Sequence, residues 1–181
     1  MKRADAFKLL ELKLKNKNLI KHSLAVEACM KRLAKKFDED TEMWGLAGLL
    51  HDLDYEDTKD DFSRHGFVTA DMLEEQDVDD QVIDAIKAHP GHTERKTVMA
   101  KALFAVDPLT GLIVAACLMH PEKKLDALNR EFVLKRFKEK SFARGVSREQ
   151  IRACLDIGLL LEDFVDVCLE AMKEISNDLG M

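Results

Sequence analysis

Histidine and carboxylate side chains are the residues of this chain whose types and spacing could do chemistry. The chain has six histidines, and five ligand-type positions fall in order at or near the ends of predicted helices: His22, His51-Asp52, His65, His89 and Asp107. Imidazole and carboxylate groups without thiolate favour cations such as Mn²⁺, Fe²⁺, Co²⁺, Ni²⁺ or Zn²⁺. Such an ion lowers the pKa of a bound water to about 7, which provides hydroxide at neutral pH. These residues therefore predict a metal site whose bound hydroxide could attack a phosphate ester.

Each of these residues, taken singly, is also compatible with an ordinary structural role. The His51-Asp52 pair ends an apolar segment, and consecutive helical residues point about 100° apart. Both side chains can thus reach one cation only at the helix flank or at its C-terminal end. His22 could be a buried histidine with ordinary partners. Asp107 follows the apolar segment 102–106 and precedes Pro108, so it could bind a metal or cap the next helix.

The ordered set as a whole resembles the HD-domain superfamily of metal-dependent phosphohydrolases. The resemblance spans about residues 18–120, which is two-thirds of the chain. The matching segments are His22-Ser23, residues 47–52 ending in His51-Asp52, His65-Gly66, Ile86-Lys-Ala-His89 and residues 106–111 around Asp107.

The resemblance implies a helical bundle with one or two divalent ions. In this interpretation, the first ion is bound by four side chains: His22, His51, Asp52 and Asp107. A second ion would be bound by His65 and His89, with Asp52 as the bridge. His92 could join or replace His89, whereas His120 is expected on the surface.

The loop after the His-Asp pair departs from the common family pattern. Many members read His-Asp-Ile-Gly-Lys there, whereas this chain reads His51-Asp-Leu-Asp-Tyr-Glu56. The usual basic residue is missing. Alongside Asp52, we take Asp54 and Glu56 as candidate catalytic residues that could serve as general acid, orient a water or support the metal ligands. Solvated loop acids are the alternative.

A basic segment outside the resemblance is a candidate phosphate contact. Lys140 and Arg144 lie just before the N-terminus of a predicted helix, where basic side chains and backbone N–H groups can receive a phosphate. We expect one of them to bind substrate. Simple solvent exposure is the alternative for this basic segment.

The elements that must position these residues are helices throughout. Apolar residues recur at helical spacing from Leu19 to Phe37, and the segment 43–50 is apolar nearly all round, which predicts a place in the middle of a bundle. Further helices are expected at 64–75, 81–88, 97–106, 108–119 and 122–138, and a long helix is expected from the capping box Ser147–Gln150. Alternation and hairpin turns typical of strands are absent.

The fold class predicted is all-α, a single-domain helical bundle of the HD-domain type. We place the metal-binding core at 18–120 and a C-terminal helical extension packed on it at 121–181. A length of 181 residues suits one domain.

Composition limits the classes of function. Hydrophobic residues make up 46% and charged residues 34%, as in folded soluble proteins. The net charge of −6 argues against general nucleic-acid binding. Residues 1–37 hold 11 Lys/Arg against 3 Asp/Glu, and residues 38–80 hold 2 against 16. This contrast suits a cation site beside a phosphate-binding wall, although solvated helix faces explain it equally well.

Targeting and redox signals are few. The longest apolar runs, such as Gly45–Leu50, are far shorter than the roughly 20 residues of a membrane span. No secretory signal is recognisable, and the four cysteines are widely spaced without a Cys-x-x-Cys pair. We therefore expect a cytoplasmic protein with reduced core thiols and no membrane association.

The function that these observations favour is hydrolysis of a phosphate ester by a metal-activated hydroxide. The expected partner is a small soluble phosphorylated substrate, with a nucleotide as the first candidate; monoester and diester remain open, as does homo-oligomerisation. Two alternatives are a di-iron oxygenase of the same superfamily and a non-catalytic module that binds a nucleotide or a metal.

Overall fold

The computed structural model describes all residues, 1–181, and contains helices and no β-strands. The elements are, in order, α1 (Arg3–Lys13), α2 (Lys17–Phe37), α3 (Thr41–Leu50), α4 (Tyr55–Thr58), the 3₁₀ turn η1 (Phe62–Arg64), α5 (Phe67–Glu74), α6 (Asp80–Ala88), α7 (Val98–Met119), η2 (Leu125–Ala127), α8 (Arg130–Lys138), α9 (Arg148–Arg152), η3 (Ala153–Ile157), α10 (Leu161–Glu174) and α11 (Ser176–Leu179). The all-α fold class is confirmed.

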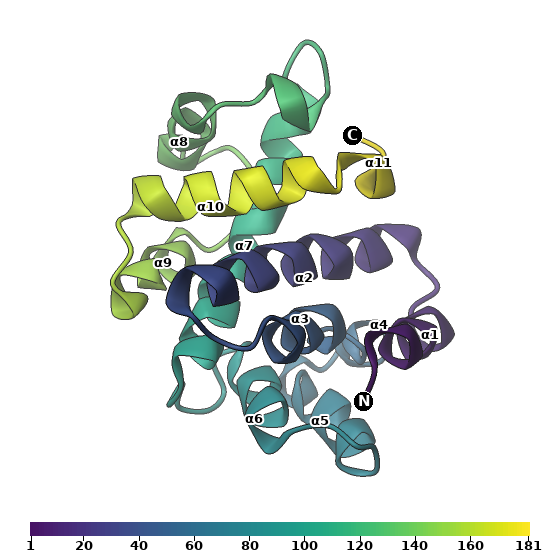
Figure 1. Cartoon of the computed structure of the whole chain (residues 1–181). Helices are drawn as coiled ribbons and strands as arrows, with labels where there is room; N and C mark the ends of the chain where they lie inside the picture. The colour runs from purple at the N-terminus through teal and green to yellow at the C-terminus, as the bar shows by residue number, and fades with distance from the viewer.

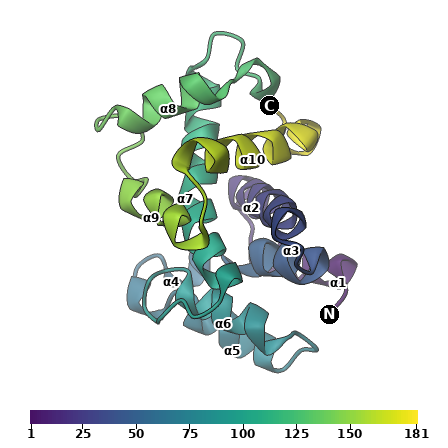
Figure 2. The ribbon, with the colours of Figure 1, turned by 60° about the vertical axis from the view of Figure 1, so that its left-hand side comes forward.

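Helix α7 runs through the length of the molecule, and the other elements are arranged around it. In Figure 1 α2 and α10 run across it, and in both views α5 and α6 lie at one end and α8 lies at the other (Figures 1 and 2). A single cluster of 47 buried apolar residues fills the space between these helices. Helices from both the predicted core region and the predicted C-terminal extension contribute to this one cluster.

Helix α3 lies inside the bundle because its apolar residues cover nearly its whole circumference. Asp40 caps its N-terminus by accepting hydrogen bonds from the N–H groups of Glu42 and Met43. Gly48 permits an unusually close approach to α2, since a Cβ atom there would lie 2.9 Å from the backbone of Glu27. This contact sets the distance between the two helices that bear His22 and His51.

The prediction of two helices at 97–106 and 108–119 is wrong, because α7 continues through Pro108. Proline removes one backbone hydrogen bond and need not end a helix whose remaining turns are buried. Asp107 thus lies inside α7 and not at its end. The continuous helix is long and apolar enough to span a membrane, which the count of short apolar runs missed. A core helix has the same properties, and twelve residues of α7 are buried within this bundle.

Three other boundaries differ from the expected ones. The helix predicted at 122–138 is split into η2 and α8, because Asn129 caps a new helix by accepting from the N–H of Phe132. The long C-terminal helix is interrupted after η3, where Gly158 adopts φ +75°. Helix α5 begins at Phe67, so His65 precedes it and does not open it. The N-terminal helix α1 was not predicted.

Candidate metal centre

The predicted metal ligands converge at one place from separate parts of the chain. Helix α2 carries His22, the end of α3 carries His51 and Asp52, and the segment before α5 carries His65. The end of α6 carries His89, and the middle of α7 carries Asp107. All six line or lie beside one cavity of about 330 Å³ that is open to solvent on one side.

Two overlapping groups of ligand atoms share His51. In one, His22, His51 and Asp107 bring their atoms within 4.8 Å of one another; in the other, His51, Asp52 and His89 do the same. The contacts include His22 Nε2 to Asp107 Oδ1 at 3.1 Å and His51 Nε2 to Asp52 Oδ1 at 3.5 Å. These are spacings that allow neighbouring ligands to share an ion.

Asp52 belongs to the second group and also faces His22 of the first. Its Oδ2 is 3.7 Å from His22 Nε2, while its Oδ1 is 3.2 Å from His65 Nε2 and 3.5 Å from His89 Nε2. The imidazole nitrogens Nε2 of His65 and His89 are themselves only 3.1 Å apart. One carboxylate therefore faces ligands on both sides, which is the arrangement expected of a residue that bridges two ions.

In each of the four imidazoles, the nitrogen that points away from the centre, Nδ1, has a hydrogen-bond partner. His51 Nδ1 is 2.8 Å from the carbonyl of Gly48, and His89 Nδ1 is 2.7 Å from the carbonyl of Ile86. Because a carbonyl only accepts, each of these nitrogens carries a proton, so Nε2 is the one nitrogen of each ring that can bind an ion at the centre. Both histidines occupy the C-cap of their helix, where the helix dipole also favours a cation.

The side chain of Thr110 holds His22 in the same way. Its hydroxyl donates to the carbonyl of Asp107 at 2.9 Å, so at 3.2 Å it can only accept from His22 Nδ1. The histidine then presents Nε2 to the carboxylates. Nothing in the sequence singled out Thr110, although it lies within the segment that matches the family.

Asp54 is fully buried and satisfied by donors from three residues. Its Oδ1 accepts from His65 Nδ1 at 2.7 Å, and its Oδ2 accepts from the N–H groups of Gly66 and Thr69 at 2.8 and 3.0 Å. A carboxylate held in this way fixes the ring of His65 and the start of α5. Of the roles that the sequence left open for Asp54, support of a metal ligand is the one that this geometry favours.

Electrostatics at the centre follow from burial and charge. Burial lowers the pKa of His51 to about 4, which keeps its imidazole neutral at pH 7. Burial would also lower the pKa of His65, but the bonds to Asp52 and Asp54 outweigh it and raise this pKa to about 9. Burial would raise the pKa of Asp52, yet His51, His65 and His89 hold it well below its ordinary value.

The chemistry of the donor set fits a divalent cation. His51 Nε2 is buried and has no hydrogen-bond partner, although it lies 3.5 Å from one carboxylate and 3.9 Å from another. A buried lone pair left without a partner is costly unless a ligand takes it. Six residues would hold one or two ions: His22, His51, Asp52, His65, His89 and Asp107.

Several predicted site residues lie elsewhere. Glu56 accepts hydrogen bonds from the N–H groups of Lys15 and Asn16 through its carboxylate, which joins α4 to the α1–α2 connection. His92 Nε2 contacts the carbonyl of Phe62 at 2.8 Å, and His120 packs on the ring of Phe132 after α7. The structure thus places His89, and not His92, in the cluster.

Lys140 and Arg144 do not line the cavity, although the turn that follows them does, through Gly145, Val146 and Ser147. This turn is shaped by Arg148, whose guanidinium donates to the carbonyls of Ala143 and Val146 at 2.7 and 2.9 Å. The sequence did not single out Arg148. Its role depends on a turn conformation that a residue pattern does not encode.

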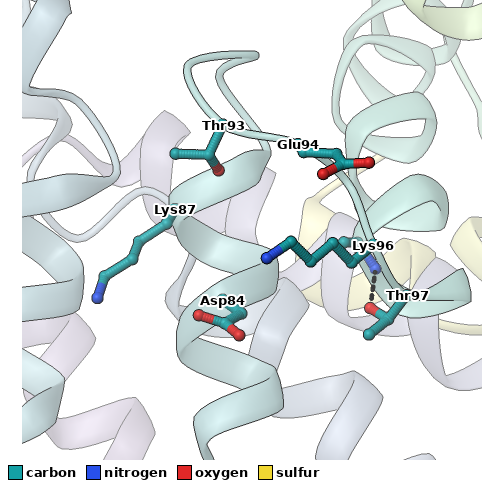
Figure 3. Close-up of a pocket in the computed structure, with 7 residues that line it drawn as sticks. Asp84, Lys87, Thr93, Glu94, Lys96 and Thr97 are labelled. Carbon is teal, nitrogen blue, oxygen red and sulfur yellow. Dashed lines mark hydrogen bonds between the residues drawn. The ribbon is translucent and has the colours of Figure 1, made fainter.

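A second cavity of similar volume, about 340 Å³, lies between α6 and the start of α7 (Figure 3). Its charged lining consists of Asp84, Lys87, Glu94 and Lys96, without any histidine. The side chains of Lys87 and Lys96 extend in different directions in this view, and they do not converge on a common point. Histidines and carboxylates therefore occur together in only the first of these two cavities.

The fold and the site together define an all-helical protein with a histidine–aspartate cluster able to bind a divalent metal. A family model described as HD domain matches residues 19–137, so the chain belongs to the HD-domain superfamily of metal-dependent phosphohydrolases.

Curated relatives match most or half of the chain. Ribonuclease Y of a Nitratiruptor species is 30% identical over 165 residues, which cover 90% of this chain and 31% of that protein. Ribonuclease Y of Aliarcobacter butzleri is 34% identical over 93 residues, 51% of this chain and 18% of its own length. Ribonuclease Y 2 of Levilactobacillus brevis is 30% identical over 94 residues, 52% of this chain and 18% of its own. The chain thus spans a third or less of the length of these relatives.

Proposed function

We propose that this protein is a metal-dependent phosphohydrolase whose substrate is a nucleotide phosphate ester. The observation that carries the proposal is the convergence of four imidazoles and two carboxylates on one solvent-open cavity, with one buried imidazole nitrogen unpartnered. A divalent ion bound there supplies Lewis acidity, lowering the pKa of a coordinated water and neutralising charge on phosphate oxygens.

The chain's own residues would orient the substrate and the ligands. Carbonyls of Gly48 and Ile86 and the hydroxyl of Thr110 keep three imidazoles aimed at the centre, so little reorganisation is needed. Asp54 holds His65 in the same way. Ser147 and Gln150 also line the cavity, and their side chains could donate to a phosphate oxygen.

A phosphodiester in a short single strand of RNA is the particular substrate we favour over a monoester. The cavity shares residues with two others: Pro90, Ser147 and Gln150 with one of about 520 Å³ that contains Arg95 and Arg152, and His22 with one of about 360 Å³. A substrate longer than one nucleotide could therefore extend past the centre on both sides. The relatives named Ribonuclease Y are a second reason.

The test is a hydrolysis assay on protein depleted of metal and reloaded with Mn²⁺, Fe²⁺, Co²⁺ or Zn²⁺. Substrates are mononucleotides, dinucleotides and a short single-stranded oligoribonucleotide, assayed with and without oxygen. Asp52→Asn should abolish turnover, which would exclude a contaminating nuclease. The matched change Asp57→Asn in the neighbouring helix α4 should leave turnover intact. Turnover that requires oxygen would favour the oxygenase, and tight nucleotide binding without turnover would favour the binding module.

A further inference from the structure

Exposed aromatic side chains occur at only one place in this molecule. The chain has eleven aromatic residues, one Trp, one Tyr and nine Phe. Two of them are exposed, Tyr55 by 38% and Phe62 by 52%, and both line the cavity of about 330 Å³ at the candidate metal centre. The other nine are buried or half-buried. Large apolar surfaces left in water at a cavity mark a binding site.

The two exposed rings flank His65. The ring of Phe62 lies 4.9 Å from the imidazole at an angle of 34°, and the ring of Tyr55 lies 5.7 Å from it, edge-on at 83°. His65 Nε2 is in turn 3.2 Å from Asp52. A flat group in contact with these rings would therefore be a direct neighbour of a phosphate held at the centre.

The backbone that carries each ring is anchored by hydrogen bonds at or next to it. The carbonyl of Phe62 accepts from His92 Nε2 at 2.8 Å, and the imidazole of His92 stacks on Phe67 with an interplanar angle of 12°. Tyr55 follows Asp54, which is held by donors from three residues. Ordered aromatic surfaces lose little entropy on binding, which is why they serve as contact residues.

We propose that Tyr55 and Phe62 form a stacking site for an unpaired nucleobase of the substrate whose phosphate is held at the metal centre. This inference rests on the proposed function and adds to it the residues that recognise the base. Stacking on a ring tolerates every base, because each has a π-face. The site would therefore select single-stranded or unpaired nucleotides without selecting sequence.

The test compares substrates with and without a base. For a short oligoribonucleotide, Phe62→Leu should raise KM about tenfold or more, the range expected for the loss of one stacked base, while Phe62→Trp should restore it. For the same strand with an abasic residue at the cleaved position, Phe62→Leu should leave KM unchanged. Phe132→Leu, the same chemical change outside the cavity, should affect neither substrate.

A fluorescence measurement separates this inference from the proposed function. A strand that contains 2-aminopurine should lose fluorescence on binding to the unaltered protein, and Phe62→Leu and Tyr55→Leu should each reduce that quenching. The same measurement with 2-aminopurine ribonucleoside 5′-monophosphate shows whether a single nucleotide is enough for quenching. Hydrolysis with equal KM effects on intact and abasic strands, or no quenching, would overturn the stacking site. Quenching without hydrolysis would leave it standing and overturn the proposed function instead.

Discussion

Each imidazole in this site depends on a second group that holds it in place. A carbonyl, a hydroxyl or a carboxylate accepts a hydrogen bond from Nδ1 of each of the four imidazoles, so that Nε2 faces the centre. The carboxylates of Asp52 and Asp107 have no such support and are held by the imidazoles themselves. The imidazoles and carboxylates therefore depend on one another for their positions. Replacing one of them should also displace its neighbours.

Replacement of the shared carboxylate tests this dependence. Asp52→Asn keeps the size of the side chain but removes the charge that faces four imidazoles, so we expect metal retention to fall by about 100-fold or more relative to the unaltered protein, beyond the roughly 10–100-fold effect of a supporting residue. Metal content after dialysis is the measurement. Retention equal to that of Asp57→Asn, a change of another acid in the neighbouring helix α4, would contradict the proposed ligand set.

Metal binding should release protons, because the centre is partly protonated when it holds no ion. Bonds to two carboxylates outweigh burial and raise the pKa of His65 to about 9, so this imidazole must lose its proton to become a ligand. We therefore expect release of about one proton or more per binding event at pH 7 and an apparent affinity that rises from about pH 6 to 8. Calorimetry in buffers of different ionisation enthalpy measures this, and binding without proton uptake by the buffer would refute it.

The raised pKa of His65 also makes the stability of the metal-free protein depend on pH. A histidine whose pKa is higher in the folded state, about 9 against an ordinary 6.5, stabilises the fold fully below pH 6.5. That stabilisation is lost as the pH rises toward 9. His51, whose pKa is lowered to about 4, acts in the opposite sense and destabilises as the pH falls below 6.5.

At the scale of elements, the close crossing of α2 and α3 sets the distance between ligands. Gly48→Ala would place a Cβ atom 2.9 Å from the backbone of Glu27, so one helix must move. We expect a loss of about 1–3 kcal/mol in the free energy of unfolding, together with weaker metal binding.

Denaturant unfolding with a second glycine variant provides the comparison. Gly111→Ala in α7 would meet only a side-chain methyl of Val146 at 3.8 Å, and it should raise stability by up to about 1 kcal/mol through helix propensity. Equal effects of the two substitutions would show that the crossing is not tight.

The sequence predicted which side chains lie together at the site better than it predicted where the helices begin and end. Imidazole and carboxylate types in a fixed order carry their chemistry with them, so five positions could be named without coordinates: His22, His51-Asp52, His65, His89 and Asp107. Element ends depend on tertiary packing: burial of α7 outweighs the helix-breaking tendency of Pro108. The supporting partners were missed because a backbone carbonyl or the hydroxyl of Thr110 has no pattern of its own.

At the scale of the whole molecule, the centre joins elements that are distant in sequence. The ligands come from α2, α3, α6, α7 and the segment before α5. An ion bound by all of them must favour the folded state, because an unfolded chain offers no such site.

Removal of the metal should therefore lower thermal stability. At an ion concentration of about 100 times Kd, the stabilisation is about 2.7 kcal/mol, which corresponds to roughly 5–10 °C in Tm for a chain of this size. Thermal unfolding with and without EDTA measures the difference, and excess Mn²⁺ or Zn²⁺ should reverse it. A Tm that does not respond to chelation would argue against a resident ion.

His51 and His89 are both C-cap residues of helices and candidate ligands, and each bonds through Nδ1 to a carbonyl one turn back. An alanine at either position would empty a coordination site and also let the end of its helix fray. Loss of turnover in such a variant would then have two causes that an assay cannot separate. Circular dichroism of each variant would report loss of helix separately from loss of turnover. An asparagine at either position would keep the cap but remove the imidazole, so its effect would report lost coordination alone.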